Sequence, residues 1–276
     1  MTHYRERLYS NYYSGHANTG ATEHATLART NLPWAKRLIR RTIPSDRGTR
    51  LVDLGCGYGR LLFGLKSMGY DNCVGVDGSE SQLMVGRQLG LEPLILSEIE
   101  AFLRAAPDQS FDVVTAIDLL EHLEKSELIE TLDQIFRILR PNGRLVIHVP
   151  NAEGIFGNRI RYADFTHETA FTQRSLRQVL GACGFSSVQC YEDEPIPHGL
   201  VSGARYILWQ LCRSVFVLLH SVETGQLAWN AILLTQNLTA VAVRSEISSC
   251  GAERFASQTR AVELGVRGEP SPSFSK

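Results

Sequence analysis

Short, almost wholly apolar segments alternate along the chain with longer stretches in which apolar residues recur at helical spacing. The apolar segments lie at residues 50–54, 74–77, 94–96, 111–117 and 145–149. Strands of a parallel sheet are covered on both faces and are therefore apolar along their whole length, so we interpret these segments as buried strands. The alternation of strands with helices predicts an α/β fold, a doubly wound sheet with right-handed crossovers.

The helices between these strands have recognisable starts and stops. Pro33 suits the first turn of a helix that runs to about Arg41. Ser79 and Gln82 have the spacing of a capping box, which predicts a helix from there to about Gly90. Apolar residues at helical spacing predict a further helix with one apolar face, formed by Leu128, Leu132, Ile135 and Leu139. We expect this helix to stop at Arg140-Pro141-Asn142-Gly143.

The remainder of the chain predicts a helix at 173–183, a strand at 185–191, a helical segment at 203–220 and a last strand at 238–243. We expect an N-terminal helical and aromatic segment (1–32), which contains Tyr9, Tyr12 and Tyr13, then a catalytic domain (33–244) with a helical insertion (200–235) before its last strand. Residues 245–276 are rich in Ser, Gly, Arg and Glu, so we expect them to form a disordered tail.

The first strand leads into the most informative motif, a loop with glycines at alternate positions. Gly55, Gly57 and Gly59 follow Asp53, and glycine allows both a sharp turn and close approach of a ligand to the backbone. A dinucleotide fingerprint would read G-x-G-x-x-G, whereas this chain reads G-x-G-x-G. An acid before the loop would repel a pyrophosphate but suits an ammonium or sulfonium ligand. Asp77 ends the second strand, where an acid accepts hydrogen bonds from ribose hydroxyls.

Four motifs in order resemble those of the class I S-adenosylmethionine-dependent methyltransferases. They are Asp53-Leu54-Gly55-Cys56-Gly57-Tyr58-Gly59, Val76-Asp77, Phe111-Asp112-Val113-Val114 through Asp118-Leu119-Leu120-Glu121-His122-Leu123, and Leu139-Arg140-Pro141-Asn142-Gly143-Arg144-Leu145. The resemblance implies a Rossmann-like sheet of seven strands whose last strand is antiparallel. It also implies S-adenosylmethionine as the cofactor, bound by Asp53, Gly55, Cys56, Gly57, Gly59, Asp77, Gly78, Glu98 and Asp118.

Composition and charge bear on whether the chain binds nucleic acid, metal or membrane. The formal net charge of −1 gives no indication of nucleic-acid binding. The six cysteines form no CxxC pair, so we expect reduced thiols, no zinc site and no metal. The N-terminus has no apolar core of a signal peptide, and no apolar stretch predicts a membrane span. We therefore expect a cytoplasmic location, with contact at the inner face of the membrane left open.

Methyl transfer to a hydroxyl requires a group that takes the hydroxyl proton. His167 is our candidate base, and Asp164 our candidate to orient it or to bind the acceptor; a purely structural role for this segment, which precedes a helix, stays open. His148 alternates within a strand and is interpreted as structural, while His122 is assigned equally to a helix start or to the site.

The segment from Asp164 to Leu176 resembles bacterial methyltransferases associated with surface-polysaccharide and lipid-linked glycan assembly. We therefore expect O-methylation of a sugar or lipid-linked glycan. The alternatives are methylation of a small metabolite and cofactor binding without catalysis. The apolar segment at 203–220, interrupted by Arg205 and Arg213, could pack in the core, cover the active site, form a dimer contact or lie on a membrane.

Overall fold

A computed structural model describes residues 21–225 and 232–246. Its centre is a seven-stranded sheet in the order β3-β2-β1-β4-β5-β7-β6. All pairings are parallel except those of β7, which runs antiparallel to both β5 and β6. The strands are β1 (Leu51–Leu54), β2 (Cys73–Asp77), β3 (Leu94–Leu96), β4 (Phe111–Ile117), β5 (Leu139–Pro150), β6 (Phe185–Glu192) and β7 (Asn237–Arg244). The predicted fold class is confirmed.

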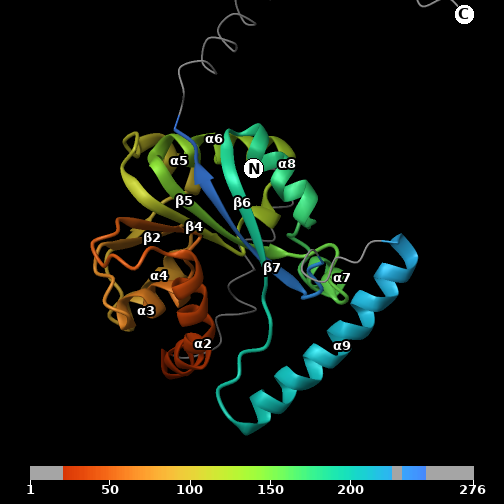
Figure 1. The fold of residues 1–276 in the computed structure, drawn as a ribbon. Helices are drawn as coiled ribbons and strands as arrows, with labels where there is room; N and C mark the ends of the chain where they lie inside the picture. The colour runs from red at the N-terminus through yellow and green to blue at the C-terminus, as the bar shows by residue number, and fades with distance from the viewer. Residues whose placement is uncertain (1–20, 226–231, 247–276) are drawn as a thin grey trace, which may run out of the picture. The chain divides into compact units, whose positions relative to one another are not determined.

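Helices cover both faces of the sheet (Figure 1). One layer consists of α2 (Ala21–Thr42), α3 (Arg60–Ser67) and α4 (Glu80–Gln88), and the other of α5 (Ile99–Ala105), α6 (Lys125–Ile138) and α8 (Gln173–Ala182). Each layer closes its own apolar core against the sheet. Alternate residues of the central strands face opposite cores, so Val114 lies in one and Val113 in the other, and both are fully buried. The strands are therefore apolar throughout because both of their faces are covered.

The sheet order places a ligand crevice at the carboxyl ends of the central strands. The chain winds outward from β1 through β2 to β3 and then returns to β4 on the other side of β1. Ligands of open α/β sheets bind where the winding reverses in this way. The glycine loop after β1, Asp77 at the end of β2 and Asp118 after β4 lie at this edge.

Two predicted element boundaries are wrong. Pro33 lies inside α2 rather than in its first turn, because the helix already begins at Ala21. The Arg140–Gly143 stretch does not separate helix from strand, because α6 ends at Ile138 and β5 begins at once. The pairing of β4 with β5 instead shifts in register across this stretch, where Asn142 has a positive φ of 63°. This stretch is therefore a bulge within β5.

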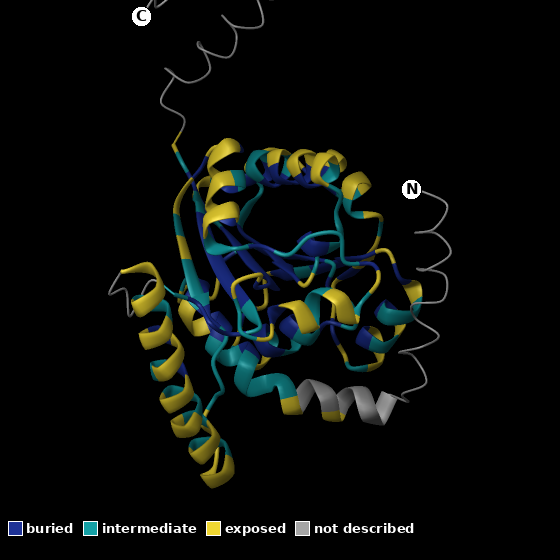
Figure 2. Cartoon of the chain, turned by 90° about the vertical axis from the view of Figure 1, so that its right-hand side faces the viewer, coloured by how far each residue is buried: buried dark blue, intermediate teal, exposed yellow. Residues whose placement is uncertain are grey.

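The long helix α9 (Leu200–Thr224) lies against the domain along only a small part of its surface. Of its 25 residues only Arg213 and Val217 are buried, and Figure 2 shows most of its length in the exposed and intermediate colours. Its exposed apolar side chains include Ile207, Leu208, Leu211, Val215, Leu218, Leu219 and Val222. The open alternative that this helix packs in the core is therefore wrong. Within the described part of the chain, no helix has the length and apolarity needed to cross a membrane.

The structure describes only part of the predicted domains and segments. Residues up to Arg244 form one unit and Ser245–Lys276 a second. Tyr9, Tyr12 and Tyr13 lie outside the described residues, as do all but the first two residues of the predicted tail. The remaining short elements are the 3₁₀ helix η1 (Leu120–His122) and α7 (Gly157–Ala163).

Candidate active site

The glycine loop between β1 and α3 is wound into a conformation that side chains disfavour. Gly55, Gly57 and Gly59 have φ values of 67°, 55° and 88°, all in the left-handed region. A Cβ atom on Gly59 would lie 2.5 Å from Cδ1 of Leu91, whereas one on Gly57 would meet no heavy atom nearer than 3.8 Å. The backbone at Gly57 therefore faces open space and can be approached closely by a ligand.

Asp77 holds this loop in place from the end of β2. Its Oδ2 accepts a hydrogen bond of 2.8 Å from the backbone N–H of Gly57, and its Oδ1 accepts one of 2.8 Å from that of Ser79. Burial raises the pKa of the Asp77 carboxyl, while the two N–H donors oppose this shift. Each carboxylate oxygen keeps an acceptor site beyond these bonds, so Asp77 can also receive ribose hydroxyls.

Asp53 lies at the base of the same loop as a buried acid. Its Oδ1 accepts a hydrogen bond of 2.6 Å from the hydroxyl of Thr115 on the neighbouring strand β4. Burial raises the pKa of Asp53 to about 7, although Thr115 and Arg60 oppose the shift. A cationic ligand near the loop would favour the ionised form, which fits the sulfonium expected from the sequence.

Glu98 and Cys56, two further residues predicted to bind the cofactor, lie at the same edge of the sheet but have different surroundings. A Cβ on Gly78 would lie 3.3 Å from Oε1 of Glu98, so Glu98 lies beside the end of β2. Cys56 is buried, and its Sγ packs against Gly75 of β2. Burial raises the pKa of the Cys56 thiol, so this side chain stays a neutral thiol.

Asp118 follows β4 with a backbone φ of 54°, a conformation uncommon outside glycine. Its Oδ1 pairs with Nδ1 of His148 at 2.5 Å, and its Oδ2 accepts from Arg60 at 3.1 Å. Nε2 of His148 lies 3.3 Å from Oδ2 of Asp193, so this imidazole bridges two carboxylates. The ring of Trp34 contacts both cations, with its centroid 5.5 Å from that of His148 and 4.2 Å from the Arg60 guanidinium carbon.

The ion pairs of His148 and Asp118 determine the charges of both side chains. Burial by itself lowers the pKa of His148, but the charge of Asp118 and the bonds to both acids raise it to about 10. Partial desolvation raises the pKa of Asp118, but His148 and then Arg60 lower it to about 2. His148 is therefore a cation at neutral pH with both ring protons engaged, which makes it unsuitable as a proton acceptor.

A cavity of about 710 Å³ opens beside this cluster. Its wall includes Asp118 and His148 from the sheet, Trp34 from α2, Asp193 after β6 and Phe156 near α7. The helix α9 contributes Ser202, Arg205, Leu208, Trp209 and Cys212. The prediction that α9 covers the site is therefore compatible with its position, because the helix forms one wall of this cavity.

Two buried polar atoms of the cavity wall have no hydrogen-bond partner among the described residues. They are Nε1 of Trp209, a donor, and Oδ1 of Asn237, an acceptor. Buried polar atoms are rarely left unpaired in a folded protein. Both atoms are buried beneath the surface of the wall, so a ligand in the cavity would reach them only after the wall rearranges.

His167 and Asp164 lie in the loop after α7, apart from the residues that line the cavity. Nδ1 of His167 lies 3.1 Å from the carbonyl oxygen of Ile160, so Nδ1 carries the proton and Nε2 the lone pair. Oδ1 of Asp164 instead accepts from the backbone N–H and the hydroxyl of Thr166, whose hydroxyl in turn lies 2.8 Å from Nδ1 of His122. By its hydrogen bonds, Asp164 organises the loop and orients His122.

Sequence reasoning missed the cluster around His148. The prediction that His148 is structural stays a prediction, but the sequence did not show that its ring bridges two acids at the cavity wall. A signal existed: a titratable residue stands near the carboxyl end of an otherwise apolar strand, at the edge where ligands bind. Trp34 and Asp193 carried no such signal, because only the fold brings their segments together.

The doubly wound sheet, the glycine loop and the acids at the carboxyl ends of β1 and β2 are together typical of S-adenosylmethionine-dependent methyltransferases. Residues 27–190, more than half of the chain, match the protein family described as "Methyltransferase domain". The chain belongs to this family.

Known proteins agree with this assignment. A putative methyltransferase, YqeM, of Bacillus subtilis is 32% identical over 120 residues, which is 42% of this chain and 47% of that protein. The mitochondrial ubiquinone biosynthesis O-methyltransferase of Dictyostelium discoideum is 26% identical over 38% of this chain and 36% of its own length. This chain thus spans about half or less of these curated relatives.

Among solved structures, an S-adenosylmethionine-dependent methyltransferase from Archaeoglobus fulgidus is 25% identical, with a TM-score of 0.58 over 77% of this chain and 94% of that chain. A second structure, described as a possible histamine N-methyltransferase from Thermotoga maritima, has a TM-score of 0.56 over 89% of this chain and 100% of that chain. It is 15% identical and bears on the fold alone.

Proposed function

We propose that this protein transfers the methyl group of S-adenosylmethionine to an oxygen of a sugar or lipid-linked glycan. The observation that carries the proposal is the cavity beside Asp118, whose wall is both polar and apolar. The carboxylates of Asp193 and Glu194 in this wall can accept hydrogen bonds from the hydroxyls of a sugar. The wall formed by α9 continues outward into exposed leucines, which suit the apolar part of a lipid-linked acceptor.

The chemistry required of the protein is modest. The sulfonium of the bound cofactor supplies a methyl group with a good leaving group, so alignment of the acceptor oxygen dominates catalysis. In the transfer, the C–S bond breaks as the C–O bond forms, and the acceptor hydroxyl loses its proton. We propose that Nε2 of His167 takes this proton, because the bond from Nδ1 to Ile160 leaves the lone pair on Nε2. Since His167 does not line the cavity, the proposal requires that the acceptor hydroxyl extend beyond the cavity wall.

Replacing His167 with Ala should lower turnover by about 100-fold, the lower range for loss of a general base. Affinity for S-adenosylhomocysteine should stay unchanged, because His167 lies in a different segment from the glycine loop. The measurement is transfer of labelled methyl to glycan and metabolite extracts, read as a mass shift. His220→Ala is the matched control, because His220 is a histidine of α9 that does not line the cavity. Equal turnover in the two variants would exclude His167 as the base.

We further propose that α9 brings the protein to a membrane surface that carries the acceptor. An amphipathic helix binds a bilayer through its exposed apolar side chains. Replacing Leu211 and Leu218, which are 62% and 61% exposed, with Glu should abolish flotation with liposomes. Met84→Glu is the control, since Met84 is a 52% exposed apolar residue on α4.

The outcome of this experiment separates the alternatives for α9. If the wild-type protein floats no better than the double variant, membrane contact is wrong. If the double variant instead converts a dimer to a monomer in analytical ultracentrifugation, α9 is a dimer contact. The cavity would then serve a water-soluble acceptor, either a free sugar or a small metabolite.

A further inference from the structure

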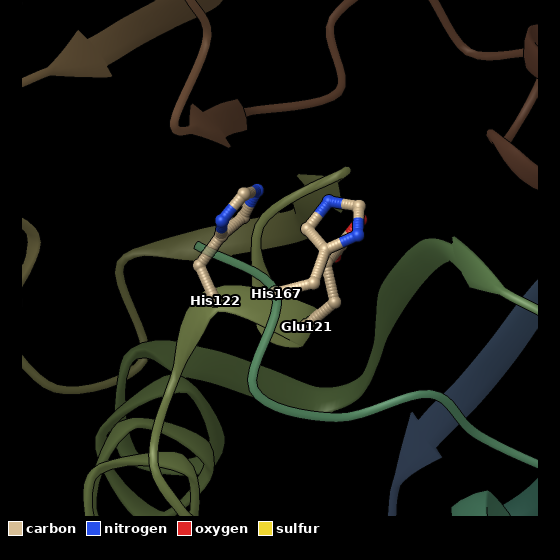
Figure 3. Close-up of side chains that lie close together, drawn as sticks. All are labelled: Glu121, His122 and His167. Carbon is tan, nitrogen blue, oxygen red and sulfur yellow. The ribbon is translucent and has the colours of Figure 1, made fainter. Parts of the chain in front are cut away.

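Three side chains with metal-binding atoms, one of which is the proposed base His167, meet apart from the residues that line the cavity. One ligand atom from each of Glu121, His122 and His167 lies within 4.8 Å of the other two. Figure 3 shows the imidazole rings of His122 and His167 side by side, with the carboxylate of Glu121 largely hidden behind the His167 ring. Glu121 and His122 belong to η1, while His167 comes from the loop after α7.

The backbone holds these two segments together without help from the three side chains. The carbonyl oxygen of Glu121 accepts hydrogen bonds from the backbone N–H groups of Glu168 at 2.7 Å and Thr169 at 3.1 Å. The rings of His122 and His167 meet edge to face, with their centroids 4.7 Å apart. The cluster is therefore built in advance rather than assembled from mobile surface groups.

Hydrogen bonds select the tautomer of each imidazole. The hydroxyl of Thr166 donates to Asp164, so it accepts from Nδ1 of His122 at 2.8 Å. Nδ1 of His167 likewise donates to the carbonyl of Ile160. In both rings the second nitrogen, Nε2, then carries the lone pair that binds a metal. Metal-binding histidines are commonly oriented by a hydrogen bond from the other nitrogen, as seen here.

The carboxylate supplies an independent observation. Glu121 is only 1% exposed, and its Oε2 is a buried oxygen with no hydrogen-bond partner among the described residues. A buried carboxylate oxygen without a partner is costly. A cation bound between Oε2 and the two rings would remove this cost.

We infer that Glu121, His122 and His167 form a site for a divalent transition-metal ion of the zinc type. Two imidazole nitrogens and one carboxylate are typical ligands of such ions, whereas Mg²⁺ and Ca²⁺ prefer oxygen alone. At bond lengths of about 2.1 Å the ligand atoms would lie roughly 3.4 Å apart in a tetrahedral site, so the side chains close slightly on binding. The expectation of no metal considered cysteine spacing and could not register ligands 45 residues apart in the chain, as His122 and His167 are.

The test is metal binding by the full chain without a purification tag, freed of metal by a chelator. We expect one equivalent of Zn²⁺ per chain by calorimetry, and a visible absorption band when Co²⁺ replaces Zn²⁺. His167→Ala and Glu121→Gln should weaken Zn²⁺ binding at least tenfold and abolish the Co²⁺ band. His220→Ala, which removes a histidine on α9, should bind as the wild type does.

Glu121→Gln preserves the volume of the side chain, so an unchanged melting temperature without metal will show that the variant folds. The inference is wrong if the wild type binds no Zn²⁺, or if Glu121→Gln and His167→Ala both bind it like His220→Ala. Nε2 of His167 can bind either a proton or a metal ion, so Zn²⁺ binding is measured in the absence of a methyl acceptor. Parallel titration with S-adenosylhomocysteine keeps this inference separate from the proposed transfer, because either ligand can bind while the other does not.

Discussion

Replacing Arg213 with Met should lower the free energy of unfolding by about 3–5 kcal/mol, the usual effect of breaking a buried ion pair. Arg213 is the buried charge of α9, and its Nε donates to Oε2 of Glu192 at 2.8 Å. Oε1 of Glu192 accepts from the backbone N–H of Leu234 at 2.7 Å. The substitution leaves the carboxylate of Glu192, which is 9% exposed, without its charged partner.

Thermal unfolding followed by circular dichroism measures this effect, with an expected drop in Tm of about 10 °C for a domain of this size. Arg205→Met is the matched control, because Arg205 is an exposed arginine on the same helix. The double variant Arg213→Met with Glu192→Gln should recover part of the loss, since the unpaired charge is gone. A Tm of Arg213→Met equal to that of Arg205→Met would contradict the role of this pair.

Replacing Asp77 with Ala should weaken binding of S-adenosylhomocysteine by about 10- to 100-fold. This corresponds to about 1.5–3 kcal/mol, the range for hydrogen bonds to a charged group. The substitution removes the proposed acceptor of the ribose hydroxyls and also the two bonds that hold Gly57 and Ser79. Asp77→Asn should bind poorly as well, because its amide group would place a donor against one of these N–H groups.

Isothermal titration measures this affinity, and Asp71→Ala is the control, since Asp71 is an exposed acid shortly before β2. If Asp77→Ala binds S-adenosylhomocysteine as tightly as Asp71→Ala, the assignment of the ribose site to Asp77 is wrong.

The sequence predicted the sheet and the cofactor edge because both depend on local patterns. Val113 and Val114 face opposite cores, so the whole of β4 must be apolar, and such a run is readable without a structure. The positive φ of Gly57 is likewise readable, because glycine is the residue that this loop conformation favours.

The features that sequence reasoning missed depend on contacts between distant segments. His148 gains its charge from Asp118 and Asp193, which lie 30 and 45 residues away in the chain. Similarly, His122 meets His167 only because the loop after α7 pairs with η1. The spacing of apolar residues in α9 indicated a helix but could not decide its surroundings, because core packing, dimerisation and membrane contact favour the same pattern.

The central claim is that the glycine loop binds S-adenosylmethionine rather than a nicotinamide cofactor. Isothermal titration of the wild-type protein with S-adenosylhomocysteine and with NADH tests it most directly. We predict saturable binding of S-adenosylhomocysteine at one site per chain and no heat of binding with NADH. Tight binding of NADH with none of S-adenosylhomocysteine would contradict the assignment.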